Sequence, residues 1–537
     1  MMTLKNAKIL DIFSGEVLDA NIIINNSSIE MVDFNCSVEK GKVIDLKNKV
    51  VSPTFIDGHI HIESSHLTPG EFEKLSLKFG VSKVVEDPHE IANVLGLEGI
   101  EFILNDTKYL DLYITAPSCV PSTNLESSGA KIGVEEIEKL MKLDKCLGLG
   151  EVMNYMGVIN EDEEILKKIE IAKKYKKVVD GHCPQLRGEL LNKYISKGVM
   201  SDHEAVDIEE AIEKLRLGLK VMVREGSVSK NIDLLEGLKD KDLRNVILVS
   251  DDINLEDLRR GYLINSLRKA LKYLDPLDAI KLVTINPAEY FNLNIGIKPG
   301  NSADLIIYEN FEEFKIYKVM VKGKFYEDLE FKSKKDAKVK NSVNVKYKKE
   351  DLNIKLDEGK VRVIKPIKNS LITKEIILDA KEAKKLMEEN KINRIYVLER
   401  HKGLGNVGKG LVYNFLNKGV LASTYAHDSH NLIVVGNNLD DIIIAIEKIK
   451  EIGGGFVAVD NGKVEYLRLE VAGLMSPSLE RFEEERKKLY KFIEGWSQFE
   501  DPFLTLSFLA LPVIPELKIT DKGLVKNLKL VDYLIKS

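Results

Sequence analysis

The stretch FIDGHIHI, residues 55–62, opens the pattern that decides the fold. From there to about residue 291, short apolar runs rich in Val and Ile alternate with longer stretches of helical period, such as EDEEILKKIEIAKKYK at 161–176. Apolar strands that alternate with helices indicate parallel strands covered by helices, and eight units in about 250 residues is the size of a (β/α)8 barrel. The eight runs are FIDGHIHI, VSKVVED, LDLYITAP, CLGLGEVM, KVVDGHC, VMSDHE, KVMVRE and NVILVSDD.

Sequence typical of β-strands flanks this region on both sides. Before it come the short segments AKILDI, ANIIIN, SIEMVDF and KVIDL, separated by Gly, Asn and Asp turn signals. After it, VTINPAEYFNL leads into KPGNSADLIIYENFEEFKIYKVMVKGKFYED, which again reads as strands. We therefore expect residues 1–52 and 292–332 to form one composite β layer, a flanking β-sandwich, beside a catalytic barrel at 53–291.

The rest of the chain predicts a separate domain. Residues 333–351 are rich in lysine and are typical of a solvated linker, since a basic run is more often a solvated face than a binding site. Residues 352–537 mix strands such as NRIYVLE and GFVAV with helices such as LDDIIIAIEKIKEI. The fold class is thus α/β, with a (β/α)8 barrel, a flanking β layer and a C-terminal α+β domain.

Composition favours a folded soluble protein with a small partner. The 537 residues are 44% hydrophobic and 31% charged, which excludes wholesale disorder, and the net charge of −6 offers no footprint for nucleic acid or an anionic membrane. No apolar stretch is long enough for a membrane span, and the first residues lack the core of a signal peptide, so we expect a cytoplasmic protein. The four cysteines form no CxxC pair and are expected to be reduced. Assembly into a homo-oligomer stays open.

Polar residues that can bind metal stand at the ends of these apolar runs, where a barrel builds its active site. A lone His is usually structural, and a strand-end Asp such as Asp252 is often a helix N-cap. Six such residues on five strands, at one end of a barrel, instead predict a centre for divalent cations. Imidazole and carboxylate ligands without thiolate favour Zn, Mn or Fe(II) over Ca or Mg. The six are His59, His61, Glu151, His182, His203 and Asp251.

At these residues the sequence resembles the microbial adenine deaminases of the amidohydrolase superfamily. The likeness begins with SPTFIDGHIHIESSHLTPGEF and continues through VVEDPHEIANVLG, GEVMNYMGV, DGHCPQLRGELLNKYISKGVMSDHE, VREGSVSKN, TINPAEYFNL and KPGNSADL. In the last domain it includes YAHDSHNLIVVG, IGGGFVAV and VAGLMSP. It covers nearly the whole chain, and the ordered series of motifs is far more specific than HxH alone.

The resemblance implies hydrolytic deamination of adenine to hypoxanthine and ammonia by a metal-bridged hydroxide at a binuclear centre. His59, His61 and Asp251 would hold one cation, and His182 and His203 the other. Glu151 would bridge the two, where ring-opening relatives use a carboxylated lysine. The implied cofactors are two divalent ions, Mn(II) or Fe(II), with Zn(II) as a further candidate. Asp251 and Glu151 are the expected catalytic residues, with Asp251 moving the proton.

Further residues are expected to contact the substrate, although each of them also has an ordinary structural interpretation. The motif EDPHE places Asp87, His89 and Glu90 beyond the second strand, where a loop can line the barrel mouth, although a capped turn would explain them too. Arg224 and Glu225 end the seventh strand and either contact substrate or pair with each other. In TYAHDSHN an ordinary polar loop is the alternative to a loop that closes over the mouth and excludes water. The predicted substrate-binding set is His89, Glu90, Arg224, Glu225, His427, Asp428 and His430.

Two other functions remain open at this stage. A cyclic-amide hydrolase of the dihydroorotase or hydantoinase type could use the same barrel, but the glutamate in GLGEVM and the extra domain argue against it. A purine-binding metal protein that has lost catalysis is the alternative from a different class. Retention of all six expected ligands argues against that reading.

Overall fold

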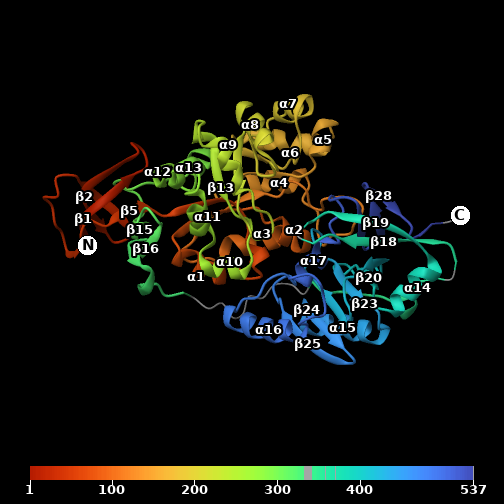
Figure 1. The fold of residues 1–537 in the computed structure, drawn as a ribbon. Coiled ribbons are helices and arrows are strands. Elements are labelled where there is room, and N and C mark those ends of the chain that lie inside the picture. Colours follow the sequence, from red (N-terminus) through yellow and green to blue (C-terminus); the bar gives the residue numbers. More distant parts are fainter. Residues whose placement is uncertain (332–341, 357, 369, 536–537) are drawn as a thin grey trace.

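The structure is a computed structural model that describes residues 1–331, 342–356, 358–368 and 370–535. Figure 1 shows a β layer at one end, the barrel with its helices in the middle, and the C-terminal domain at the other end. The first part of the expected linker, residues 333–341, lies outside the described residues. Its last part, with Val343 and Val345 buried, packs on the C-terminal domain.

The β layer is one sheet assembled from both sides of the barrel. Among the described residues it has eight strands in the order β17-β16-β15-β5-β1-β2-β3, with β4 paired to β1. Strand β15, from beyond the barrel, pairs antiparallel with β5, which leads into it. The bounds are β1 Met2–Asp11, β2 Glu16–Asn25, β3 Ser28–Asp33, β4 Lys42–Asp45, β5 Val50–Pro53, β15 Leu305–Asn310, β16 Lys315–Val321 and β17 Lys324–Phe325.

The eight apolar runs form parallel strands that curl into a barrel. The ladder has two arcs, β10-β9-β8-β7-β6-β14 and β11-β12-β13. The short β14 follows β13 and pairs with β6, while the Met200 amide donates to the Val179 carbonyl at 2.9 Å and links the arcs on the other side. The bounds are β6 Phe55–His61, β7 Val81–Glu86, β8 Asp111–Ala116, β9 Cys146–Val152, β10 Val178–Gly181, β11 Ser201–Asp202, β12 Lys220–Arg224, β13 Val246–Val249 and β14 Asp251–Asp252.

Helices surround these strands (Figure 1). Their ends follow capping chemistry: the Asp162 side chain accepts from the backbone amides of Glu164 and Ile165 at the start of α6. The bounds are α1 Pro69–Lys78, α2 His89–Leu95, α3 Leu97–Asn105, α4 Val134–Met141, α5 Tyr155–Ile159, α6 Glu163–Lys174, α7 Gly188–Ser196, α8 Ile208–Arg216, α9 Leu235–Leu238, α10 Leu255–Arg260, α11 Tyr262–Ala270, α12 Pro276–Lys281 and α13 Ile285–Phe291, with 3-10 turns at Ile62–Ser65, Ile232–Leu234 and Leu243–Asn245.

The C-terminal domain is a mixed sheet with helices on both faces, α15 on one and α16 and α17 on the face that shares a core with the barrel. Its main sheet runs β19-β18-β21-β20-β23-β22-β24-β25, with β29 paired to β18, and β26-β27-β28 form a small second sheet. The bounds are β18 Lys360–Pro366, β19 Thr373–Asp379, β20 Ile392–Leu398, β21 Val407–Tyr413, β22 Val420–Ser423, β23 Leu432–Gly436, β24 Gly455–Asp460, β25 Lys463–Arg468, β26 Leu517–Thr520, β27 Gly523–Lys526, β28 Lys529–Val531, β29 Leu534–Ile535, α14 Ala380–Glu388, α15 Leu439–Ile452, α16 Leu479–Phe492 and α17 Pro502–Phe508.

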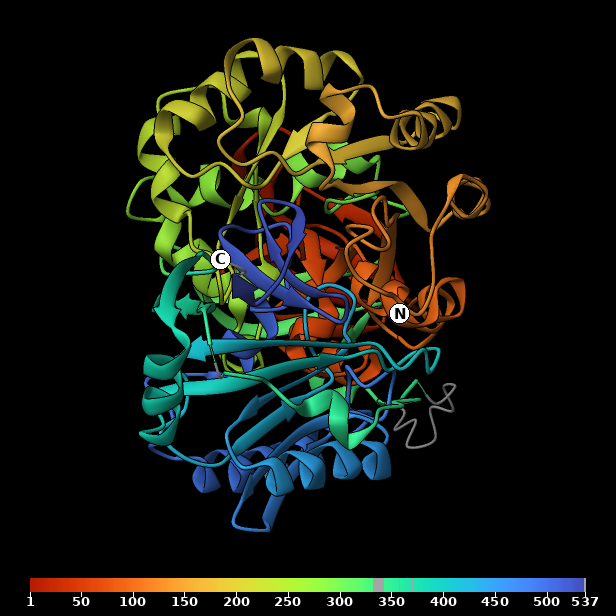
Figure 2. The same cartoon turned by 90° about the vertical axis from the view of Figure 1, so that its right-hand side faces the viewer.

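The C-terminal domain lies directly against the barrel, and Figure 2 shows its sheet beside the barrel strands. One hydrophobic core includes buried residues of both, such as Ile62 and Leu67 from the barrel side and Leu474 and Met475 from the C-terminal domain. The backbone of Ser476 exchanges hydrogen bonds with His66 at 2.8 Å and Thr68 at 3.1 Å. The segment that follows β6 is therefore held by the C-terminal domain.

The expected fold class is confirmed: a mixed α/β chain with a curled parallel sheet and a C-terminal domain. Within the described ranges, none of the helices is long and apolar enough to cross a membrane.

Candidate active site

The first strand of the barrel supplies two inward imidazoles. His59 and His61 are two residues apart on β6, so strand alternation turns both to the inside, where they are 1% and 3% exposed. The Nδ1 atom of His61 donates to the backbone carbonyl of Asp87 at 2.9 Å. This hydrogen bond fixes the ring and leaves Nε2 free to face the centre of the site, which is how metal-binding imidazoles are usually oriented.

Glu151, at the end of β9, lies at the centre of the cluster, and its two carboxylate oxygens face different partners. Oε1 is 3.4 Å from His61 Nε2. Oε2 is 2.6 Å from His182 Nδ1 and 3.3 Å from His203 Nε2. One carboxylate is thus shared between imidazoles from strand β6 and imidazoles that follow β10 and β11, which is the arrangement a bridging ligand requires.

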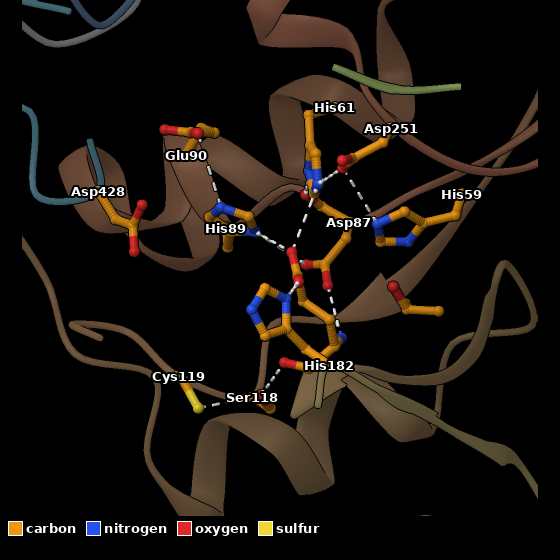
Figure 3. A network of polar contacts seen from close by, with 12 residues as sticks. His59, His61, Asp87, His89, Glu90, Ser118, Cys119, His182, Asp251 and Asp428 are labelled. Atoms are coloured by element: carbon orange, nitrogen blue, oxygen red, sulfur yellow. Dashed lines mark hydrogen bonds and ion pairs between the residues drawn. The ribbon is translucent and has the colours of Figure 1, made fainter. Parts of the chain in front are cut away.

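Asp251, on the short β14, closes the other side of the cluster. Its Oδ1 lies 3.1 Å from His61 Nε2 and 3.6 Å from His59 Nε2, and Figure 3 shows it between these two rings. Its Oδ2 accepts a hydrogen bond from Arg224 Nη1 at 2.8 Å. Arg224 also pairs with Glu204 through both terminal nitrogens. The guanidinium therefore holds one oxygen of Asp251 in place while the other faces the histidines.

The cluster is buried, so its charges depend on one another. Burial disfavours the ionised carboxyl of Glu151, but hydrogen bonds from His182, His203 and His61 hold its pKa well below the usual range. In the same way, His59, His61 and Arg224 keep the pKa of Asp251 low. Burial lowers the pKa of His59, and the neighbouring His203 lowers it further. These shifts favour the ionised form of both carboxyl groups and the neutral form of His59.

The donor atoms fit two divalent cations. His59, His61 and Glu151 form one group of three whose ligand atoms lie within 4.8 Å of one another, and Glu151, His182 and His203 form another. His59 Nε2 is buried and has no hydrogen-bond partner among the described residues, which fits a nitrogen that would bind a cation. The structure brings together all six ligands predicted from the sequence: His59, His61, Glu151, His182, His203 and Asp251.

His89 connects this cluster to the covering loop. It begins helix α2 directly after β7, and its Nδ1 lies 3.5 Å from Glu151 Oε1. Its Nε2 lies 3.6 Å from Glu90 Oε1, on the side facing the C-terminal domain (Figure 3). Both residues are buried, so the EDPHE turn lines the site.

The C-terminal domain reaches the barrel through the loop of residues 425–431, which we call the covering loop. His427 Nδ1 lies 2.8 Å from Glu90 Oε1, and His430 Nε2 contacts Glu90 Oε2. Tyr425 adds a hydroxyl contact to Ser64 at 3.2 Å. Every residue of this loop is buried, so it is not ordinary surface, and it packs against Glu90 of the EDPHE turn.

Two expectations need correction. Arg224 and Glu225 do not pair with each other, because Arg224, the last residue of β12, binds Glu204 and Asp251. Glu225 instead binds Lys269 Nζ at 2.6 Å and the Ile232 amide at 3.2 Å, outside the cluster. Asp252 is not a helix N-cap: it accepts the Ser64 hydroxyl at 2.5 Å, whereas Asn254 caps α10.

Two residues with carboxyl groups near the site were not predicted as site residues from the sequence. Glu204 follows His203 and binds Arg224, and its place at a strand end was a usable signal. Glu126 lies in the long connection between β8 and α4, where no local pattern marks it. Burial and the neighbouring carboxylate of Asp428 raise the pKa of Glu126 to about 8. Its approach to the covering loop depends on contacts between distant segments.

Comparisons with known proteins show the family of the chain. The amidohydrolase family model matches residues 50–326, and the model of the adenine deaminase C-terminal domain matches residues 370–529. The chain is 57% identical to an adenine deaminase of Methanocaldococcus jannaschii, with all of both chains covered. It is 41% identical to an adenine deaminase of Clostridium acetobutylicum over 97% of this chain and 95% of that one. A third, from Archaeoglobus fulgidus, is 40% identical over 97% and 93%.

Proposed function

Because this chain belongs to the adenine deaminase family of amidohydrolases, we propose that the cluster around Glu151 is the site at which it converts adenine to hypoxanthine and ammonia. The observation that carries the proposal is the division of the two Glu151 oxygens between His61 on one side and His182 with His203 on the other. A carboxylate with this position can hold two cations at once. A lysine at this position could do so only after carboxylation.

The residues would hold the cations in two sets that share Glu151. His59, His61 and Asp251 form one set, and His182 and His203 the other. When bound, two divalent cations would make water a good nucleophile near neutral pH and polarise the substrate. Nitrogen and carboxylate donors without thiolate suit Mn(II) or Fe(II), which we propose as the cations, with Zn(II) as the third candidate.

Asp251 is placed to move the proton. Deamination adds water at C6 of the purine and expels ammonia, so a proton must travel from the water to the departing nitrogen. The Oδ2 atom of Asp251 is held by the hydrogen bond from Arg224. Its Oδ1 atom therefore faces His61 at the centre of the site. A positioned carboxylate of this kind acts as general base and then as general acid.

The covering loop would exclude water from the site. A purine is small and flat, so it cannot by itself close the barrel mouth to solvent. A buried loop from another domain can close it. His427 stacks on Phe508 of α17 with the rings 7° from parallel and 4.5 Å apart, which stiffens the wall. The His427 and His430 side chains contact Glu90, so we assign them to holding the loop in place.

We also propose that the enzyme works in the cytoplasm on free adenine, without nucleic acid or membrane partners. The net charge of −6 gives no positive field for a polyanion, and a neutral base needs no charged funnel.

The decisive test follows ammonia release from adenine by the purified chain after loading with Mn(II) or Fe(II). Adenosine and hydantoin serve as comparison substrates. We expect deamination of adenine and no ring opening of hydantoin. The matched variant Glu151→Gln keeps the side-chain volume but removes the shared charge, so it should lose activity and bind less metal, measured by elemental analysis. A Glu151→Gln protein with two metals and full turnover would contradict the two-cation site.

A further inference from the structure

The covering loop contains a carboxylate oxygen that the rest of the molecule leaves unsatisfied. Asp428 is 3% exposed, and its Oδ2 has no hydrogen-bond partner within the described part of the chain. Its Oδ1 is 3.7 Å from His427 Nδ1, beyond hydrogen-bond distance. A buried carboxylate oxygen without a hydrogen-bond donor costs folding free energy, so its presence here points to a donor that arrives with the substrate.

The surroundings of Asp428 tell which kind of donor fits. Both oxygens of Glu90 are occupied, by His427 and His430, so these two histidines are already committed. Neither histidine of the covering loop therefore donates to Asp428 Oδ2. The titratable neighbours of Asp428 are His89, Glu90, Glu126, His427 and Glu151.

Asp428 also lies at a suitable distance from the centre of the cluster. The ligand atoms of His89, Glu90 and Asp428 lie within 4.8 Å of one another, and His89 Nδ1 is 3.5 Å from Glu151 Oε1. In Figure 3, Asp428 lies on the side of the C-terminal domain, and His89 lies between it and the labelled His61 and His182. One small flat molecule could thus extend from Glu151 past His89 to Asp428.

We propose that Asp428 Oδ2 accepts a hydrogen bond from the imidazole-ring N–H of the purine and so restricts the enzyme to free bases. This rests on the proposed function, which places C6 and its amino group at the Glu151 cluster. The imidazole ring lies at the other end of a purine and carries one N–H, at N7 or N9. A nucleoside has a sugar on N9 and cannot offer that hydrogen while it fits beneath the loop. Asp428 is then a specificity-determining residue.

The test compares adenine with 7-methyladenine and 9-methyladenine on the metal-loaded enzyme. Sites built to hydrogen-bond a substrate N–H reject analogues that lack it by roughly 10⁴-fold, so at least one methyl isomer should be a far poorer substrate of the wild type. In Asp428→Ala, kcat/KM for adenine should fall by about 10²-fold or more while that for the rejected isomer stays nearly constant. The inhibition constants of hypoxanthine and of its methylated counterpart, measured separately, give the same comparison without turnover.

Asp441→Asn is the matched control. This buried aspartate of the same domain accepts the backbone amides of Asn461 and Gly462 at 3.0 and 2.9 Å, away from the site, so its variant should keep the wild-type discrimination. If Asp428→Ala does not fold, Asp428→Val supports the same comparison, because valine also has no hydrogen-bond acceptor. Equal losses for adenine and both methyl isomers would overturn the proposal, because they indicate a packing role. A wild type that never deaminates adenine would instead overturn the proposed function.

Discussion

At the scale of single residues, the placement of Asp251 gives a prediction about chemistry. One oxygen is fixed by Arg224 and the other faces His61, so Asp251→Asn keeps the shape but removes the proton acceptor. General-base catalysis typically contributes about 10²–10⁴-fold, and kcat should fall by that factor. Thermal unfolding of the variant should remain cooperative. A variant with wild-type kcat and normal metal content would remove Asp251 from the proton path.

The residues of the cluster could be identified from the sequence because each stands at the end of an apolar run. His59 and His61 are separated by one residue on a strand, which fixes both on one side. Their partners were harder to predict. Arg224 binds Glu204 and Asp251, 20 and 27 residues away, and not its neighbour Glu225. The choice depends on how strands β11, β12 and β14 lie next to one another, which no local pattern encodes.

At the scale of elements, the covering loop is held by two buried residues after β20. Arg400 is 0% exposed and donates to the backbone carbonyls of Ala472 at 2.8 Å, Ser342 at 3.0 Å and His430. Burial lowers its pKa to about 9. Next to it, His401 Nε2 donates to the carbonyl of Ser429 at 2.7 Å. The loop is thus fixed through its backbone, which leaves side chains such as Asp428 free for a ligand.

His401 makes this anchor sensitive to pH. Burial and the charge of Arg400 keep the pKa of His401 well below its usual range, so the folded protein holds it neutral. An unfolded chain binds a proton there below about pH 6.5, and stability is therefore present above that pH and lost as pH falls. Between pH 6.5 and 5, the unfolding free energy should drop by up to about 1.4 kcal/mol per pH unit more than in His401→Gln. Urea unfolding at several pH values measures the difference, and parallel curves would contradict it.

At the scale of the whole molecule, the barrel and the C-terminal domain share a site as well as a core. The alternation of strands and helices predicted the barrel, and the motif TYAHDSHN indicated a covering loop. The contact of His430 with Glu90, 340 residues apart, and that of Asp521 with the Ser127 amide at 2.8 Å could not be predicted. They follow from how two domains pack, which depends on the fit of whole surfaces.

This shared core predicts how the chain behaves when it is divided. Leu67 and Met475 belong to one hydrophobic cluster, so residues 1–331 produced alone would expose apolar surface that the intact chain buries. We expect this fragment to aggregate or to unfold at a lower temperature. Co-expressed with residues 342–537, it should form a one-to-one complex, detected by size-exclusion chromatography, that unfolds in one calorimetric transition and deaminates adenine. A fragment 1–331 that stays monomeric alone, with both metals and the kcat of the intact enzyme, would show that the C-terminal domain is dispensable for the site.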